Sequence, residues 1–284
     1  MVNGFALGAV LFIVAIGLSL VFGTMDVLNL AHGSISLIGA YVGVAVLGGG
    51  ASSAMSFVAV LIAAMIGLLA GVLLAVLTTS VTDHLRQAML TLGVAMIAGD
   101  VLLMIFGGDV KSVAPPPALA GTITVLGAPA PVYRLVLIGV GLVVGIGLWL
   151  LLEKTQIGAI VRATVADRGM VEAIGVRTRL VLAGVFGGGA ALAAVGGLIA
   201  APLLGAQPGN DNLILLYALV IVVIGGLGSF KGAAVGALLV GQVQTLGVYF
   251  LATYASFLMF AVMAAVLLIK PSGLLPAKHG GGGH

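Results

Sequence analysis

The polar side chains best able to bind a solute stand together in a short segment, MDVLNLAHGS at residues 25–34, between two strongly apolar stretches. They supply a carboxylate, an amide, an imidazole and a hydroxyl, from Asp26, Asn29, His32 and Ser34. A charge at the centre of a bilayer costs about 2.5 to 3.5 kcal/mol on insertion scales, so Asp26 should face protein or water rather than lipid. We therefore predict that these four side chains line a passage for a polar solute.

Two glycines, Gly23 and Gly33, bracket this segment, which indicates that a helix is broken there. Unwound backbone is tolerated at membrane depth only where it is buried in protein or lines a cavity. Two alternatives stay open. The segment could form a cytoplasmic turn in which Asp26 and Asn29 cap the next helix, and His32 could be a hydrogen-bonded histidine of the core.

A second interruption lies in the other half of the chain, in VIGGLGSFKGAAVG at residues 223–236. Paired glycine-broken apolar segments in corresponding halves are the best sequence indication of a transport site between internal repeats. We therefore expect Gly225 and Gly226 to line the same passage, opposite residues 25–34. A tight turn between two helices accounts for these glycines equally well.

Asp100, in VAMIAGDVLLMIFGG, is a further acidic residue inside an apolar run. An ionisable residue within the membrane by default marks a pathway or has a buried partner, so we add Asp100 to the predicted passage. Its side chain could alternatively reach the outer surface near Gly107.

Catalytic and cofactor motifs are absent from the sequence. It has no cysteine, no Gly-Lys dipeptide and hence no phosphate-binding loop, and no G-x-S-x-G or H-E-x-x-H spacing. It has four histidines, one of them in the terminal GGGGH, so a metal site is not expected. We expect neither enzyme activity nor a cofactor in this chain.

The composition places these residues in an integral membrane protein. Hydrophobic residues make up 62% and charged residues 7% of the chain, and the mean hydropathy is +1.34, which leaves too few polar groups to cover a water-soluble globule. The 45 glycines favour closely packed helices, and the G-x-x-x-G relation of Gly184 and Gly188 predicts such a packing face. A net charge of +3 gives no indication of nucleic-acid binding.

About 20 helical residues are needed to cross the hydrocarbon layer of about 30 Å. Apolar runs near this length predict an all-α, polytopic membrane protein with eight to nine transmembrane helices, of which the second, seventh and eighth are the weakest. The runs are 4–22, 27–47, 55–80, 88–107, 132–152, 179–204, 213–229, 232–247 and 250–269. We expect residues 1–279 to form a single transmembrane domain and 280–284 to be the remnant of a linker and tag.

The positions of Lys and Arg predict the orientation, because positively charged flanks stay in the cytoplasm. If residues 153–178 are inside, nine of the 11 Lys and Arg residues lie inside, and only Lys111 and Arg134 lie outside. With nine spans the N-terminus is then outside. The proline-rich loop 108–131 lies outside too, and we expect it to form a stiff, non-helical cap.

The inner segment carries the densest charge of the chain, in RATVADRGMVEAIGVRTR. Ala166, Met170, Ala173 and Ile174 recur there at helical spacing, which predicts one short amphipathic helix. Gly175 is placed to end it.

Four stretches carry a resemblance that runs in order over nearly the whole chain. They are GLSLVFGTMDVLNLAHGSISLIGAYVG at 17–43, RATVADRGMVEAIGVRT, VIGGLGSFKGAAVGALLVG and the closing KPSGLLP. These stretches resemble the permease subunit of bacterial ABC importers of the branched-chain amino acid type. The resemblance implies a multi-pass protein of the bacterial inner membrane that pairs with a homologous permease subunit. It also implies two cytoplasmic ATPase subunits, which bind the ATP and Mg²⁺, and a periplasmic substrate-binding protein.

In this family the inner segment forms a coupling helix that docks on the ATPase. The matching residues are Arg162, Asp167, Arg168, Glu172 and Gly175. The residues alone leave open an interfacial helix that lies on lipid headgroups. The chain departs from the family at Gly99 and Asp100, where Gln or Glu is frequent, and at Gly169, which interrupts the usual run of alanines and leucines.

The function implied by the resemblance is import of branched-chain or related amino acids by alternating access. Relatives that carry urea, amides or aromatic acids share the same pattern. A passive channel or secondary transporter is the alternative from another class.

Overall fold

The computed structural model describes residues 1–25, 28–48, 50, 52–81, 83–125 and 127–276, so that Asp26 lies outside the described residues. These residues form α-helices, two 3-10 helices and one antiparallel hairpin. The α-helices are α1 (Val2–Met25), α2 (His32–Leu47), α3 (Ser53–Thr79), α4 (His84–Phe106), α5 (Val132–Lys154), α6 (Gln156–Ala166), α7 (Arg168–Ala173), α8 (Thr178–Leu204), α9 (Asn210–Gly225), α10 (Phe230–Phe250) and α11 (Ala255–Ile269). The others are η1 (Pro117–Leu119), η2 (Ala252–Tyr254), β1 (Thr122–Val125) and β2 (Ala128–Pro131).

Within the described part of the chain, six helices are long and apolar enough to cross a membrane, namely α1, α3, α4, α5, α8 and α10. Shorter apolar helices α2, α9 and α11 fall in the second, seventh and ninth of the predicted runs. The predicted all-α polytopic architecture is thus confirmed. The number of spans, eight or nine, stays a prediction.

Two details of the predicted runs are wrong. The eighth run, predicted at 232–247, is too short at both ends, since α10 extends from Phe230 to Phe250. The seventh run is predicted to extend to residue 229, whereas α9 ends at Gly225 because Gly226 adopts a φ of +104°, which does not continue a right-handed helix.

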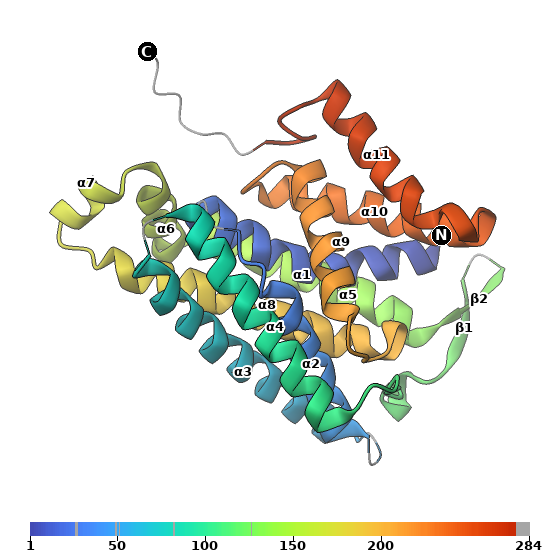
Figure 1. Cartoon of the computed structure of the whole chain (residues 1–284). Coiled ribbons are helices and arrows are strands. Elements are labelled where there is room, and N and C mark those ends of the chain that lie inside the picture. The colour runs from blue at the N-terminus through green and yellow to red at the C-terminus, as the bar shows by residue number, and fades with distance from the viewer. Residues whose placement is uncertain (26–27, 49, 51, 82, 126, 277–284) are drawn as a thin grey trace.

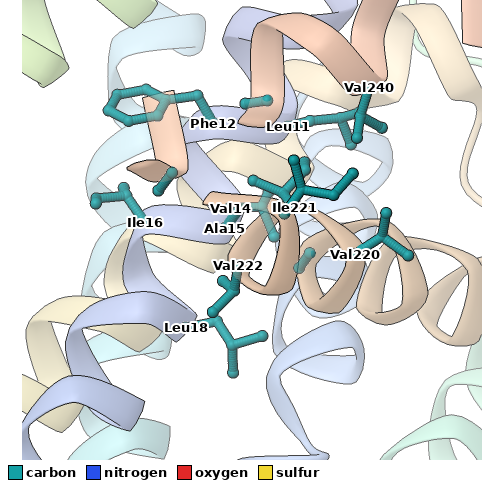
Figure 2. Close-up of a cluster of buried hydrophobic side chains, with 14 of the residues drawn as sticks. Leu11, Phe12, Val14, Ala15, Ile16, Leu18, Val220, Ile221, Val222 and Val240 are labelled. Carbon is teal, nitrogen blue, oxygen red and sulfur yellow. The ribbon is translucent and has the colours of Figure 1, made fainter. Parts of the chain in front are cut away.

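Helix α1 lies at the centre of the molecule and packs against α5, α8, α9 and α10 (Figure 1). It is apolar on all faces, which is typical of a helix that is buried on all sides. The cluster in Figure 2 joins α1 to α9 and α10 through residues that include Leu11, Ile16, Val222 and Val240. Burial of α1 therefore organises one half of the bundle.

Helix α8 organises the other half, where it packs against α1, α2 and α3. The backbones approach so closely that a methyl group at Gly17 of α1 would overlap the carbonyl oxygen of Gly189. A methyl group at Gly197 would likewise overlap the carbonyl oxygen of Ser36 in α2. Such contacts between small residues are how membrane helices gain packing energy without a hydrophobic drive between them.

The predicted packing face of Gly184 and Gly188 does not pack within the described part of the chain. Among the described residues, no other element would come within 4 Å of a methyl group at either position. The glycines of α8 that do contact neighbouring helices, including Gly189 and Gly197, lie on other faces of the same helix. Spacing alone identified a stripe of small residues but not the one that meets a neighbour.

The two ends of the bundle carry different structures (Figure 1). Helices α6 and α7 lie at one end, and the β1–β2 hairpin lies at the other, in the register Thr122 opposite Pro131. The hairpin end also holds the N-terminus, since Arg134 donates a hydrogen bond to Asn3. This arrangement agrees with the predicted orientation, in which the N-terminus and the loop 108–131 share a side.

The loop 108–131 is not entirely non-helical as predicted, because η1 forms one 3-10 turn that begins at Pro117. Proline is compatible with the start of a helix, where its missing N–H is not needed. Further along the same face, Lys111 and Ala206 exchange two backbone hydrogen bonds with N···O distances of 2.8 and 2.9 Å. This bridge joins the loop after α4 to the loop after α8.

The contact between α2 and α8 predicts the outcome of a small substitution. Gly197→Ala should destabilise the protein by about 1 to 3 kcal/mol, because the added methyl group forces the two backbones apart. Gly188→Ala is the matched control in the same helix and should leave stability unchanged or slightly raised. The melting temperature in detergent measures both, and equal melting temperatures for the two variants would contradict the prediction.

Candidate functional site

Helix α2 begins beside the middle of α1 rather than at its end. Nε2 of His32, the first residue of α2, lies 2.8 Å from the carbonyl oxygen of Val14. Val14 precedes the last residue of α1, Met25, by 11 residues, or about 16 Å of helix. The described residues just before α2, 28–31, therefore lie within the helical bundle.

His32 and Asn29 hold this segment in place. A carbonyl oxygen can only accept, so Nε2 of His32 donates to Val14. His32 is fully buried, as in the alternative of a hydrogen-bonded core histidine. Asn29 is also fully buried, and its Oδ1 accepts a hydrogen bond of 3.1 Å from the N–H of Ala31 at the start of α2, as in the capping alternative. A role of either residue in a passage stays a prediction.

Thr91 of α4 satisfies the backbone of the same segment from the other side. Its Oγ1 accepts a hydrogen bond of 3.1 Å from the N–H of Leu30 and lies 3.3 Å from the carbonyl oxygen of Leu28. Polar backbone groups outside a helix must be satisfied in this way when no water is at hand. Nothing in the sequence marks Thr91, which looks like an ordinary helix residue in an apolar run.

The first turns of α2 and α9 meet at Ser34 and Asp211. The hydroxyl of Ser34 donates to Oδ2 of Asp211 at 3.0 Å and lies 3.3 Å from the carbonyl oxygen of Ala95 in α4. A methyl group at Gly33 would overlap the backbone carbonyl of Asp211. Both helices thus direct the partial positive charge of their N-termini toward one place, where a carboxylate is favourable.

Asp211 opens onto a cavity of about 250 Å³ between α4 and the segment that leads into α9. Asp100, which is exposed, lines the same cavity together with Gly99. Asp211 therefore links Ser34, which donates a hydrogen bond to it, and Asp100, which lines the same cavity. Asp211 was not among the residues predicted from the sequence. The available signal was an acidic residue at the start of an apolar run, which marks the first turn of a helix.

Gly225 and Gly226 do not lie at this place. They are at the opposite end of α9, which has 16 residues and is about 24 Å long. The closing segment of the chain covers them, with the N–H of Leu275 donating to the carbonyl of Gly225 at 3.0 Å. This is the tight-turn alternative, and the expected position of Gly225 and Gly226 beside Ser34 is corrected. Among the described residues, the end of α1 approaches the turn, since a Cβ atom at Gly23 would lie 2.8 Å from Cα of Gly228.

The inner segment forms two helices, α6 and α7, instead of the single amphipathic helix predicted from Ala166 to Ile174. The break falls at Asp167, whose Oδ1 accepts a hydrogen bond of 2.9 Å from the N–H of Met170. A side chain that caps a new helix in this way competes with continuation of the preceding one. Gly175 ends α7 with a φ of +89°, which confirms that part of the prediction.

The predicted coupling residues lie on or next to these two helices. Arg162 is exposed on α6. On α7, Nε of Arg168 lies 3.0 Å from Oε1 of Glu172, and Thr178 at the start of α8 donates to the same oxygen. Both hydrogen bonds lower the pKa of the Glu172 carboxyl below its ordinary value, and the bond from Thr178 has the larger effect. The side chains of Met170 and Ile174 are 68% and 74% exposed beside them.

The family model described as branched-chain amino acid transport system, permease component, matches residues 1–267. The chain belongs to this family. It is accordingly a multi-pass permease of the bacterial inner membrane.

Curated relatives of this permease cover nearly its whole length. The high-affinity branched-chain amino acid transport system permease protein BraD of Pseudomonas aeruginosa is 28% identical, over 97% of this chain and 94% of its own. LivH of Escherichia coli K12, of the same description, is 27% identical with the same coverage. A probable branched-chain amino acid transport permease protein LivH of Methanocaldococcus jannaschii is 31% identical over 45% of this chain and 44% of its own. No solved structure matches the permease significantly.

The contacts of Glu172 predict its titration. Because its pKa is lowered in the folded permease, these contacts stabilise the junction of α7 and α8 fully above the ordinary pKa of glutamate and are lost as the pH falls through the lowered value. Thr178→Val should raise the pKa toward its ordinary value, while Thr79→Val at the exposed end of α3 should not change it. Glu153 and Glu172 are the only glutamates, so ¹³C-glutamate labelling gives two resonances to follow by NMR. A Glu172 pKa that does not respond to Thr178→Val would contradict the assigned cause.

Proposed function

We propose that this permease is a membrane subunit of an ATP-driven importer that carries branched-chain or related amino acids across the inner membrane by alternating access. It works with a homologous permease subunit, two cytoplasmic ATPase subunits and a periplasmic substrate-binding protein. ATP and Mg²⁺ are bound by the ATPase subunits, and this chain carries no catalytic group for hydrolysis.

The observation that carries the proposal is the family match, which extends over residues 1–267 and thus over all the predicted spans except the last two residues of the ninth. The names of the two full-length relatives, which describe high-affinity branched-chain amino acid transport, support the choice of cargo. A match of this extent favours a common architecture, whereas cargo can change with a few side chains.

The polar contact between α2 and α9 supports transport through the helical bundle. Discontinuous membrane helices with N-termini that meet inside the protein are the usual way in which transporters make a polar site at depth. Here the described residues place Ser34 and Asp211 at such a meeting point, with Asp100 on the same cavity. Asn29 and His32 belong to the segment around the start of α2 that positions Ser34.

Helices α6 and α7 supply the surface on which the ATPase subunits dock. Met170 and Ile174 present exposed apolar side chains, and Arg168 and Glu172 form an ion pair next to them. An apolar surface edged by charged side chains fits a groove on a protein partner. ATP binding by the partners moves this segment, and the movement passes to α8 through the contacts of Thr178.

The importer predicts a strict dependence on partners. Proteoliposomes with this chain alone should take up no radiolabelled leucine, and uptake should appear when the second permease, the ATPases, the binding protein and ATP are all present. Omission of ATP serves as the control. Uptake by the chain alone, without nucleotide, would favour a passive channel or secondary transporter instead.

Docking through α7 predicts the effect of a charge reversal. Glu172→Arg should reduce ATP-driven uptake by about tenfold or more, because it breaks the ion pair with Arg168 and places like charges on one face of α7. Glu153→Arg makes the same change of charge at the exposed end of α5 and should have little effect. Membrane insertion should be the same for both variants, and unchanged uptake by Glu172→Arg would refute the docking role.

A further inference from the structure

Asp211 is a buried carboxylate without a cationic partner among the described residues. Its exposed fraction is 9%, and its one side-chain hydrogen bond, from Ser34, goes to Oδ2. Oδ1 accepts none, and in the described part of the chain no Lys, Arg or His nitrogen lies within 4 Å of either oxygen. The N-termini of α2 and α9 supply only partial positive charge, so a carboxylate buried here favours a positively charged ligand.

The cavity onto which Asp211 opens has room for such a ligand. Its volume is about 250 Å³, and a Cβ atom at Gly99 on the facing wall would lie 3.7 Å from Oδ2 of Asp211. Asp100, one residue further along α4, adds a second carboxylate to the lining. The described residues hold no group of three or more His, Asp or Glu side chains that could bind a metal ion, and Ca²⁺ and Mg²⁺ take six or more oxygen ligands. An ammonium group, which needs only a few acceptors for its N–H donors, fits this lining better.

A second cavity lies on the other side of the contact between Ser34 and α4. It has a volume of about 100 Å³, and apart from Ser34 its lining is apolar, with Ile35, Leu74 and Val94 among the residues of α2, α3 and α4 that form it. An apolar cavity of about 150 Å³ binds benzene in another protein. A cavity of this smaller size therefore suits an isopropyl or isobutyl group.

We propose that the cavity at Asp211 and Asp100 binds the α-ammonium group of an amino acid cargo, and that the apolar cavity beyond Ser34 receives its aliphatic side chain. Ser34 lines the apolar cavity, and its hydroxyl contacts both Asp211, which lines the other cavity, and the backbone of α4, so a small shift of α4 would join the two into one site. The inference rests on the proposed function and narrows its cargo. It selects aliphatic amino acids with a free ammonium group over urea and uncharged amides.

The chain has no cysteine, so a single introduced thiol reports on the cavity. Gly99→Cys places the thiol in the cavity, and Gly93→Cys on another face of α4 is the matched control, since no other described element would touch its side chain. In membrane vesicles that carry the complete importer, a cationic aminoethyl methanethiosulfonate should react faster than the anionic sulfonatoethyl reagent at position 99. The ratio of the two rates should exceed that at position 93 by about tenfold or more, because a cleft lined by negative charge concentrates cations.

Substitution of the carboxylates separates their contributions. Asp211→Asn keeps an oxygen that accepts from Ser34 and should reduce the rate ratio at position 99 toward that at position 93. Asp100→Asn should reduce it less, because Asp100 is exposed. A ratio that is equal at positions 99 and 93, or that persists in the double variant, would overturn the proposal.

Protection of the thiol at position 99 identifies the ligand class. Leucine and isopentylamine should both slow the reaction, while 4-methylpentanoate, which lacks the ammonium group, should not. The assignment would be refuted if 4-methylpentanoate protected the thiol equally, if leucine gave no protection, or if sodium chloride protected as well as isopentylamine.

The reaction rates are measured without nucleotide, so the expected charge preference and protection can be observed even if ATP-driven uptake is absent. Absence of uptake alone would contradict only the proposed function. Loss of both charge preference and protection with intact uptake would contradict only this inference.

Discussion

The contact between the first turns of α2 and α9 is the constraint on which the other features of the site depend. Each helix has 16 residues, about 24 Å, which is less than the hydrocarbon thickness of about 30 Å. The chain must therefore pass through part of the membrane as irregular backbone, and that backbone has to be satisfied by protein. Thr91 and the side chain of Asn29 supply hydrogen bonds to it, and His32 ties the start of α2 to α1. Without these partners the polar segment could not stay inside the bundle.

The surrounding helices divide into a fixed core and a less constrained wall. Most of the apolar stretch of α1, 78%, is buried inside the chain, and α8 holds α1, α2 and α3 through glycine contacts that leave no space for a side chain. In α4 the corresponding buried share is only 17%. Besides apolar contacts of residues such as Leu102 and Phe106, α4 makes hydrogen bonds with the site through Thr91 and Ser34. A polar contact of this kind can be exchanged for another at little cost, whereas close backbone packing cannot.

The sequence predicted the all-α polytopic architecture well, because long apolar runs report directly on the membrane. It also located the polar segment 25–34, since polar side chains in an apolar run are rare. It did not reveal Asp211, because the contact with Ser34 joins residues that are 177 positions apart, and an acidic residue at a helix start needs no such partner. The positions of Gly184 and Gly188 could not identify the face of α8 that packs, because small residues recur at the same spacing on several faces of this helix. The break at Asp167 was missed because apolar periodicity ignores the ability of an aspartate to start a new helix.

The backbone bridge between Lys111 and Ala206 has a mechanical consequence. Lys111 follows the last residue of α4 by five positions, and Ala206 precedes the first residue of α9 by four. Because these connecting segments are short, the C-terminal end of α4 and the start of α9 are expected to move together. A tilt of α4 would therefore pivot about its C-terminal end, and the displacement would be largest at its N-terminal end, near His84.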